Sequence, residues 1–247
     1  MALKWGICST GKICSDFCSA LKTLPSENHQ IAAVVSRSQE NAQEFATTFD
    51  IPNVYSSYEK FAADADINIV YIGSAYTEHV KLSIQMLNAG NHVLCEKPLA
   101  DTLEDVKLVH KVAQEKNIFY GGHDIDGCII LSYSEGQKAC LIYSSKVKSD
   151  INCASIIGTN GSIEMNSHFW CPDEVIFLTG KETNEIPVGP VPFNYPNSGG
   201  LCYEAEEFRK CINSGKTEYA HYSHKDSEMV HRIMEDVAKQ IGRKLPN

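Results

Sequence analysis

The chain has 247 residues, of which 43% are hydrophobic and 21% are charged, as in ordinary globular proteins. Its formal net charge of -9, from 31 acidic and 22 basic residues, argues against nucleic acid or an anionic membrane as the main partner. No apolar run approaches membrane-spanning length and the first residues lack the apolar core of a signal peptide, so we expect a cytoplasmic protein.

The ten cysteines are scattered along the chain and include no Cys-x-x-Cys pair. The closest two, Cys14 and Cys18, lie on an expected helix face without partner histidines. Others occupy apolar strand or helix positions, such as Cys95, Cys140 and Cys153. We therefore expect reduced core thiols, with neither a disulfide framework nor a metal site.

Short apolar runs alternate with amphipathic helical patterns in the first half of the chain. Strands are expected at residues 3–8, 31–35, 54, 67–72, 92–95 and 118–120. The helices between them have apolar faces that include Phe17, Phe45, Val80, Ile84, Leu87, Val106, Val109 and Val112, and Thr102 is an expected N-cap. This alternation predicts a parallel, doubly wound sheet.

The pattern changes after Gly121 and Gly122. Residues 128–133, 139–144 and 152–158 resemble strands joined by short polar turns, and Asn160-Gly161 is a strong hairpin signal. A connection rich in proline and glycine then leads to two closing helices, with apolar positions at Ala205, Phe208, Cys211, Met229, Val230, Ile233 and Val237. We therefore predict one domain over residues 1–120 and a second, mainly antiparallel domain over residues 121–247.

The strand at residues 92–95 ends in Glu96, Lys97 and Pro98. Ligands of open α/β sheets bind in the crevice beyond the carboxyl ends of the strands, so an ammonium group placed there points at a substrate. Lys97 is our candidate catalytic residue. The alternative is that Glu96 and Lys97 are one more solvated charge pair. The Lys97-Pro98 bond is a candidate for the cis isomer.

The turn between the first strand and the first helix reads Gly6-Ile7-Cys8-Ser9-Thr10-Gly11-Lys12-Ile13. A dinucleotide-binding turn would carry glycines at positions 9, 11 and 14, where this chain has Ser9, Gly11 and Cys14. Glycines allow a pyrophosphate to approach the backbone and the positive end of a helix. The predicted cofactor contacts from this turn are Gly6, Ser9, Thr10, Gly11, Lys12 and Ile13, and the alternative is an ordinary strand-to-helix connection.

The end of the second strand bears on the choice of dinucleotide. An acidic residue there would bind the ribose diol of NAD, whereas an arginine pairs with the 2′-phosphate of NADP. The chain has Ser36, Arg37 and Ser38 there, with no acid before Glu40. We therefore predict NADP as the cofactor, bound in part by these three residues. The alternative is that Arg37 is a surface arginine without a ligand.

The loop after the fourth strand completes the predicted cofactor site. Its contributions are Ser74, Tyr76 and His79, and Glu96, Lys97 and Pro98 face them from the next strand end. We assign no catalytic role to His79, because a lone histidine in the first turn of a helix is more often structural.

These segments, together with residues 89–100, resemble the glucose-fructose oxidoreductase and inositol dehydrogenase (Gfo/Idh/MocA) family. The resemblance implies an α/β fold: an N-terminal Rossmann domain that holds NADP, then a C-terminal α+β domain whose open sheet faces the substrate and pairs two subunits. It also implies hydride transfer between NADP and a carbinol, of the kind that oxidises trans-dihydrodiols or D-xylose, with Lys97 contacting the substrate.

The family's tyrosine or histidine acid/base has no counterpart in this sequence. After Tyr120 the family continues through a substrate loop and several further elements, whereas this chain passes through His123 and Asp124 into the late sheet at Cys128. His123 or Asp124 could substitute, but they more naturally form a polar turn. The alternatives are a catalytically inactive NADP-binding isoform or relative, and a truncated product that folds poorly. The lost helices should leave apolar surface exposed on the shortened second domain.

Overall fold

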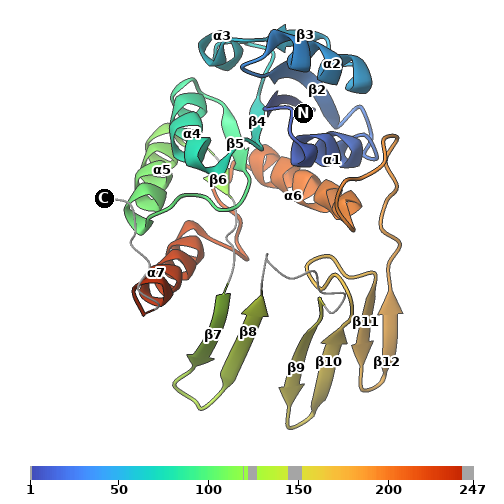
Figure 1. Ribbon diagram of the computed structural model, residues 1–247, viewed down its shortest axis with the longest axis vertical. Coiled ribbons are helices and arrows are strands. Elements are labelled where there is room, and N and C mark those ends of the chain that lie inside the picture. Colours follow the sequence, from blue (N-terminus) through green and yellow to red (C-terminus); the bar gives the residue numbers. More distant parts are fainter. Residues whose placement is uncertain (1, 119, 122–126, 144–151, 241–247) are drawn as a thin grey trace.

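The computed structural model describes residues 2–118, 120–121, 127–143 and 152–240. Figure 1 shows a parallel sheet with helices on both faces in the upper part of the molecule, and antiparallel strands in the lower part. The predicted fold class is confirmed by this arrangement. The predicted division at residue 120 stays a prediction.

Six parallel strands form the upper sheet in the order β3-β2-β1-β4-β5-β6 within the described residues. Their bounds are β1 Leu3–Cys8, β2 His29–Val35, β3 Asn53–Tyr55, β4 Ile69–Ile72, β5 His92–Cys95 and β6 Tyr120–Gly121. Cys8 pairs with both Val35 and Ile72, and Ile72 pairs with Cys95. The four central strands therefore end together at one edge, and the strand order reverses between β1 and β4, where doubly wound sheets bind their ligands.

Helices cover both faces of this sheet. The helices α1 (Lys12–Leu21) and α2 (Gln39–Phe49) pack into the buried cluster that contains Trp5, Ile7 and Phe17. A second cluster, around Val70 and Val93, receives α3 (Tyr58–Ala62), α4 (His79–Asn88) and α5 (Leu103–Lys116). As predicted, Thr102 caps α5, since its hydroxyl accepts a hydrogen bond from Asp105 N at 3.1 Å.

The buried face of α4 agrees with the prediction in part, since Leu87 is buried as expected. Leu82, Met86 and Leu87 are fully buried, whereas Val80 and Ile84 are only partly buried, as is Val112 on α5. Val80, Ile84 and Val112 pack against the margin of the cluster.

The lower part contains two antiparallel sheets rather than the single sheet expected. The strands β7 (Gly127–Ser132) and β8 (Lys138–Tyr143) form one pair. The second sheet has the order β12-β11-β10-β9, with β9 Ala154–Gly158, β10 Gly161–Met165, β11 Glu174–Phe177 and β12 Gly180–Thr183. The predicted hairpin at Asn160-Gly161 joins β9 to β10.

Large apolar side chains are exposed on the four-stranded sheet, as expected from the missing elements. Ile156 and Ile157 are 61% and 83% exposed, although neighbouring residues of a strand face opposite sides of the sheet, and Leu178 is 76% exposed. Cys140 and Cys153, expected in the core, are also exposed. That expectation was wrong because no further layer covers their strands within the described residues.

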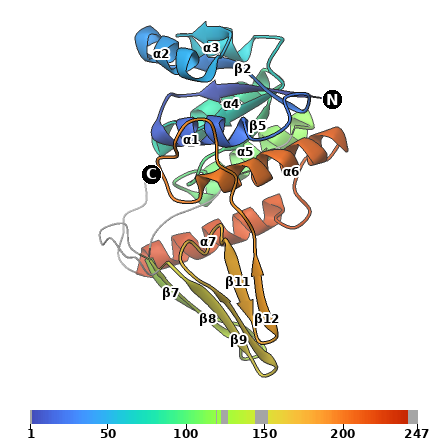
Figure 2. The ribbon, with the colours of Figure 1, turned by 90° about the vertical axis from the view of Figure 1, so that its right-hand side faces the viewer.

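The helix α6 (Leu201–Asn213) returns to the upper domain and packs against α1, as Figure 2 shows. Ala205, Phe208 and Cys211 join the same buried cluster as Trp5 and Phe17. This helix therefore belongs to the core that supports the parallel sheet.

A hydrogen-bond chain anchors α6 to the first two strands. Trp5 Nε1 donates to His29 Nδ1 at 3.2 Å, and His29 Nε2 lies 2.9 Å from Glu206 Oε2. Because an indole nitrogen only donates, His29 carries its proton on Nε2 and donates it to Glu206. Arg209 holds the other side of this carboxylate through two bonds of 2.7 Å. Arg209 and His29 together lower the pKa of Glu206 to about 2.

The last helix, α7 (His224–Gln240), packs against α5 through polar side chains. His224, Ser227 and His231 are buried, whereas Met229 is 55% exposed, so the predicted apolar stripe is not the main buried face. The rings of His110 and His224 stack with centroids 4.3 Å apart. Burial, followed by the neighbouring His224, lowers the pKa of His110 to about 4.

Two kinds of site are not found in the part of the chain that the structure describes. No helix there combines the length and apolarity that crossing a membrane requires. No group of three or more histidine, cysteine or acidic side chains is arranged to hold a metal ion.

Candidate cofactor site

The helix α1 begins without a side-chain cap. Its N-cap, Gly11, has an extended backbone, and its first turn contains no acidic residue. The first N–H groups of a helix lack partners within the helix and carry partial positive charge, so this end suits a phosphate. A Cβ added to Gly11 would meet no atom closer than 3.6 Å. The protein's own packing does not require glycine here, which fits a position kept open for a ligand.

Ser9 occupies the position of the first glycine of the usual turn and adopts a left-handed φ of 98°. Its N–H donates to Val35 O at 2.9 Å, which holds the turn against the end of β2. Side chains with a Cβ are strained in this region, whereas glycine is not.

We expect Ser9→Gly to raise the free energy of unfolding by about 1 kcal/mol, because relief of strain exceeds the added flexibility of the unfolded chain. Urea denaturation would measure this change. Ser9→Ala is the matched control, since it loses the hydroxyl but keeps the Cβ. A glycine variant no more stable than the alanine variant would contradict the assignment of strain.

Cys14 replaces the third glycine of the usual turn. Gly73, at the end of β4, leaves the space that the Cys14 side chain needs. The Cys14 thiol is buried, with Sγ 3.5 Å from Gly73 O. A Cβ on Gly73 would lie only 2.5 Å from that sulfur. The close approach of helix and strand is therefore preserved by a glycine at the end of β4. Burial raises the pKa of Cys14 to about 12, so this group is a neutral thiol.

Gly6 lies away from the other residues that were predicted to contact the cofactor from the first turn. It lies within β1, and a Cβ there would meet Phe61 Cζ at 2.6 Å. This contact gives Gly6 a packing role beneath α3.

Arg37 is exposed immediately after β2. Its neighbours Ser36 and Ser38 have local roles: Ser36 Oγ accepts from Ser38 N at 3.3 Å, and Ser38 Oγ caps α2 by accepting from Asn41 N at 3.2 Å. Arg37 forms no ion pair with any residue that the structure describes. Its guanidinium group is thus available to an anion beside the start of α1.

His79 connects the loop after β4 to the loop after β5. Its ring is 1% exposed, with Nδ1 2.7 Å from Pro98 O and Nε2 3.2 Å from Ser74 O. This geometry agrees with a structural role, since both ring nitrogens are occupied by backbone oxygens. Tyr76, in the same loop, is 46% exposed and faces solvent.

Lys97 is exposed at the end of β5, and the bond to Pro98 is cis. The neighbouring Glu96 accepts hydrogen bonds from Tyr71 Oη at 2.6 Å and from Lys97 N at 3.2 Å. The Lys97 ammonium group has no carboxylate within 4.0 Å among the described residues. A cation without a carboxylate partner in the described part of the chain therefore lies at the edge where ligands of such sheets bind.

Glu204, on the first turn of α6, was missed by the sequence analysis. It lies close enough to Glu96 for their charges to interact, and burial, followed by repulsion from Glu96, raises the pKa of Glu204 to about 7. The sequence placed α6 in the second domain and gave no reason to bring this helix to the edge of the first. The available signal was an acidic residue between the apolar positions of an amphipathic helix.

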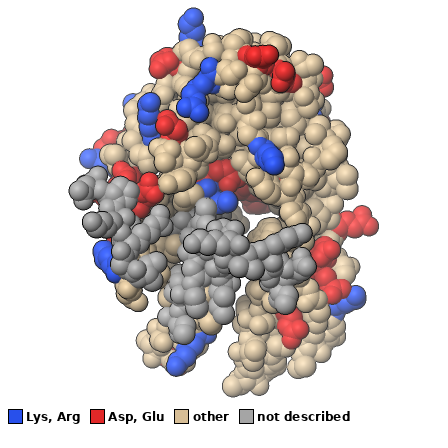
Figure 3. All heavy atoms as spheres, viewed as in Figure 1, with Lys and Arg blue, Asp and Glu red and all other residues tan. Residues whose placement is uncertain are grey.

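The start of α1, Arg37, the loop around Ser74 and Lys97 thus share the carboxyl edge of the sheet. Figure 3 shows acidic side chains gathered in a hollow near the middle of the molecule, next to a basic one. His123 and Asp124, considered as substitute acid/base residues, lie outside the described residues.

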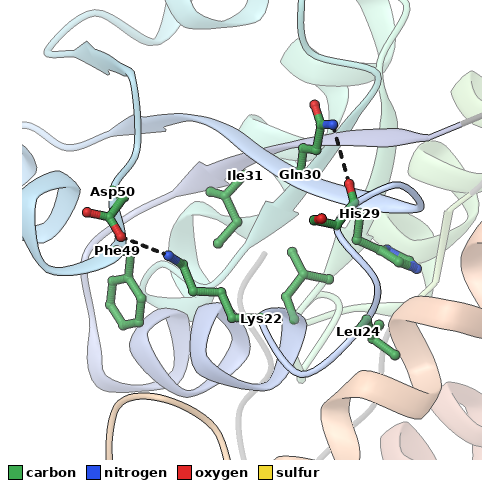
Figure 4. Close-up of a pocket in the computed structure, with 9 residues that line it drawn as sticks. Lys22, Leu24, His29, Gln30, Ile31, Phe49 and Asp50 are labelled. Atoms are coloured by element: carbon green, nitrogen blue, oxygen red, sulfur yellow. Dashed lines mark hydrogen bonds and ion pairs between the residues drawn. The ribbon is translucent and has the colours of Figure 1, made fainter.

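A pocket of about 260 Å³ opens at the opposite edge of the sheet (Figure 4). Its walls come from the end of α1, the start of β2 and the end of α2, and Lys22 pairs with Asp50 across it at 3.3 Å. None of the predicted cofactor residues lines this pocket.

Comparisons with known proteins agree with the fold. Residues 3–122 match the family model described as "Oxidoreductase family, NAD-binding Rossmann fold". A protein of Danio rerio named trans-1,2-dihydrobenzene-1,2-diol dehydrogenase is 32% identical, with 98% of each chain covered. The human protein of that name is 29% identical, with 100% of this chain and 99% of the relative covered. The first alignment spans 327 positions although this chain has 247 residues, so at least 80 positions face a gap here.

Two solved structures share the fold over nearly the whole chain. A 3-ketoreductase from Actinomadura kijaniata, in complex with NADP and TDP-benzene, has a TM-score of 0.74, 15% identity, and 99% and 98% of the two chains covered. A levoglucosan dehydrogenase in complex with NADH and levoglucosan has a TM-score of 0.74, 16% identity and complete coverage of both chains. The resemblance seen in the sequence is confirmed: the chain belongs to the Gfo/Idh/MocA family of oxidoreductases with an NAD-binding Rossmann fold.

Proposed function

We propose that this chain transfers a hydride between NADP and the carbinol carbon of a trans-dihydrodiol or a sugar such as D-xylose. The observation that carries the proposal is the Lys97 ammonium, which has no carboxylate partner among the described residues and lies at the same sheet edge as the uncapped start of α1. The names of the relatives support a dihydrodiol as the first substrate to test.

The residues at this edge fit a dinucleotide. The backbone from Ser9 to Ile13 would hold the pyrophosphate, because Gly11 leaves its approach open. Arg37 would bind the 2′-phosphate, and Lys97 would lie beside the nicotinamide ribose. When bound, the nicotinamide ring accepts or returns the hydride.

Lys97 would donate a hydrogen bond to the substrate hydroxyl and stabilise the negative charge that develops on its oxygen during oxidation. A proton must also leave that hydroxyl group, and water would accept it, because no residue of this sequence matches the family's acid/base. Lys97 would hold the carbinol in position. Ser74 and Tyr76 would contact the cofactor from the neighbouring loop, which His79 links to Pro98.

A second candidate is a relative that binds NADP without turnover. The gap of at least 80 positions favours it, because the family's acid/base residue belongs to the block that we expect to be missing. NADP binding by fluorescence quenching, followed by absorbance of the reduced cofactor with a trans-dihydrodiol and with D-xylose, separates the two. Binding with turnover supports the enzyme, and binding without turnover supports the inactive relative.

The preference for NADP rests on Arg37. We expect Arg37→Asp to lower the ratio of NADP to NAD affinity by roughly 10- to 100-fold, since a charge-assisted pair is replaced by repulsion. Titration of both cofactors by fluorescence would measure this ratio. Arg232→Asp, an exposed change on α7, is the control for net charge. An unchanged ratio in Arg37→Asp would remove the basis for preferring NADP.

We further propose that the chain acts in the cytoplasm and pairs with a second copy through its open antiparallel sheets. The exposed side chains of Ile156, Ile157 and Leu178 support an interface there. Sedimentation at several concentrations would test the pairing.

A further inference from the structure

We propose that Tyr71 is a positioning residue for Lys97: its hydroxyl group holds the carboxylate of Glu96 in place and so keeps that carboxylate away from the Lys97 ammonium group. The inference rests on the proposed function, in which this ammonium group acts on the substrate hydroxyl. It assigns a role to a buried tyrosine that the sequence pattern marked only as part of a strand.

Both oxygens of the Glu96 carboxylate have a donor. Tyr71 Oη donates to Glu96 Oε1 at 2.6 Å, and Lys97 N donates to Glu96 Oε2 at 3.2 Å. An O–H···O distance of 2.6 Å is typical of a hydrogen bond to an ionised carboxylate, which is stronger than a bond between neutral groups. Burial, followed by the charge of Glu96, raises the pKa of Tyr71 well above its usual value, so the tyrosine stays a donor.

The packing around Tyr71 fixes the position of its hydroxyl group. Tyr71 lies on β4, is 1% exposed, and stacks on Phe17 of α1 with ring centroids 3.8 Å and planes 3° apart. The strand end also leaves little free space beside the ring, since a Cβ on Gly73 would lie 3.1 Å from Tyr71 Cε1. A donor that is fixed by packing in this way can hold its partner in one position.

Without the tyrosine hydroxyl, Glu96 would be free to pair with Lys97. Glu96 Oε2 already contacts the backbone N of Lys97, which is one bond of about 1.5 Å from the carbon that carries the lysine side chain. The lysine stem is flexible and its ammonium group is exposed. Nevertheless, the two side chains form no ion pair in the described part of the chain. An ammonium group already paired with a carboxylate would stabilise charge on a substrate oxygen less well.

The test measures how fast acetic anhydride acylates Lys97 in the full chain, in mildly alkaline solution, with the Lys97 peptide quantified by mass spectrometry. Only the neutral amine reacts, and a carboxylate partner favours the protonated form. Tyr71→Phe keeps the ring and its stack on Phe17 but removes the hydroxyl group. Acylation of Lys97 should be roughly two- to fivefold slower in this variant, as expected for an exposed ion pair. The kcat for carbinol oxidation should fall by a similar factor, because only chains with a free Lys97 ammonium group are competent.

Two further variants separate this role from a merely structural one. In the Glu96→Gln background, adding Tyr71→Phe should change the acylation rate and kcat by less than about 1.5-fold, because no carboxylate is left to pair with Lys97. Tyr55→Phe is the matched control, since Tyr55 Oη donates to Asp64 Oδ2 at 2.9 Å on β3, the edge strand of the sheet. It should leave the acylation of Lys97 and kcat unchanged.

The acylation rates and the turnover test different statements. If Tyr71→Phe leaves the acylation of Lys97 unchanged, or slows it equally in the Glu96→Gln background, the inference is wrong while the proposed function stands. If the wild-type chain shows no turnover, the proposed function is wrong, and the acylation rates still decide whether Tyr71 keeps Glu96 away from Lys97.

Discussion

Replacing Lys97 with methionine is expected to lower kcat for carbinol oxidation about 100-fold or more, while NADP affinity changes less than tenfold. Removal of one preorganised donor to a developing oxyanion costs about 10²–10³ in rate. Methionine preserves most of the apolar stem of lysine and removes the charge, so the loss can be assigned to the ammonium group. Absorbance of the reduced cofactor gives kcat, and fluorescence quenching gives the affinity.

Lys111→Met is the control for this substitution, because Lys111 is a lysine on α5 whose side chain is 71% exposed. It should leave both quantities unchanged. An active Lys97→Met variant would show that the cation at the end of β5 does not act on the substrate. A wild-type chain that binds NADP without turnover would instead identify the inactive relative.

Gly73→Ala is expected to lower the free energy of unfolding by about 2–3 kcal/mol through overpacking. The added methyl group would lie 2.5 Å from Cys14 Sγ and 3.1 Å from both Ile13 and Tyr71. These neighbours are held between α1 and β4, so there is little room to relax. Urea denaturation monitored by circular dichroism would measure the loss.

A double-mutant cycle tests the cause. Cys14→Ala removes the sulfur, so Gly73→Ala should cost at least 1 kcal/mol less in that background. Gly11→Ala is the matched control for stability, since its Cβ would meet nothing closer than 3.6 Å. Equal losses from Gly73→Ala with and without the Cys14 sulfur would rule out this compensation.

The parallel sheet and its ligand-binding edge could be predicted because their signals are local. Runs of buried β-branched residues such as Ile69 to Ile72 mark strands, and the residues after them must lie at the carboxyl edge. The contributions of α6 could not be predicted in this way. The apolar positions Ala205 and Phe208 indicate that one face of α6 is buried. They do not indicate which domain this face packs against.

The sequence pattern also could not show that two residues far apart in the chain compensate for each other. Cys14 alone looks like a lost glycine, and Gly73 alone looks like a strand end, and only their contact explains both. The buried side of α7 was misread for a related reason. Its partner surface on α5 includes His110, so His224 packs there while Met229 is left exposed.

The packing of α6 against α1 affects the order in which the protein is completed on the ribosome. All six parallel strands emerge before α6, so the apolar face around Trp5 and Phe17 stays partly uncovered while the antiparallel strands are synthesised. Exposed surface of this kind makes nascent chains prone to aggregation. The missing block, which the sequence places after Tyr120, removes at least 80 positions from this interval. At roughly 5–20 residues per second, the shortened chain covers its core roughly 4–16 s sooner than its relatives.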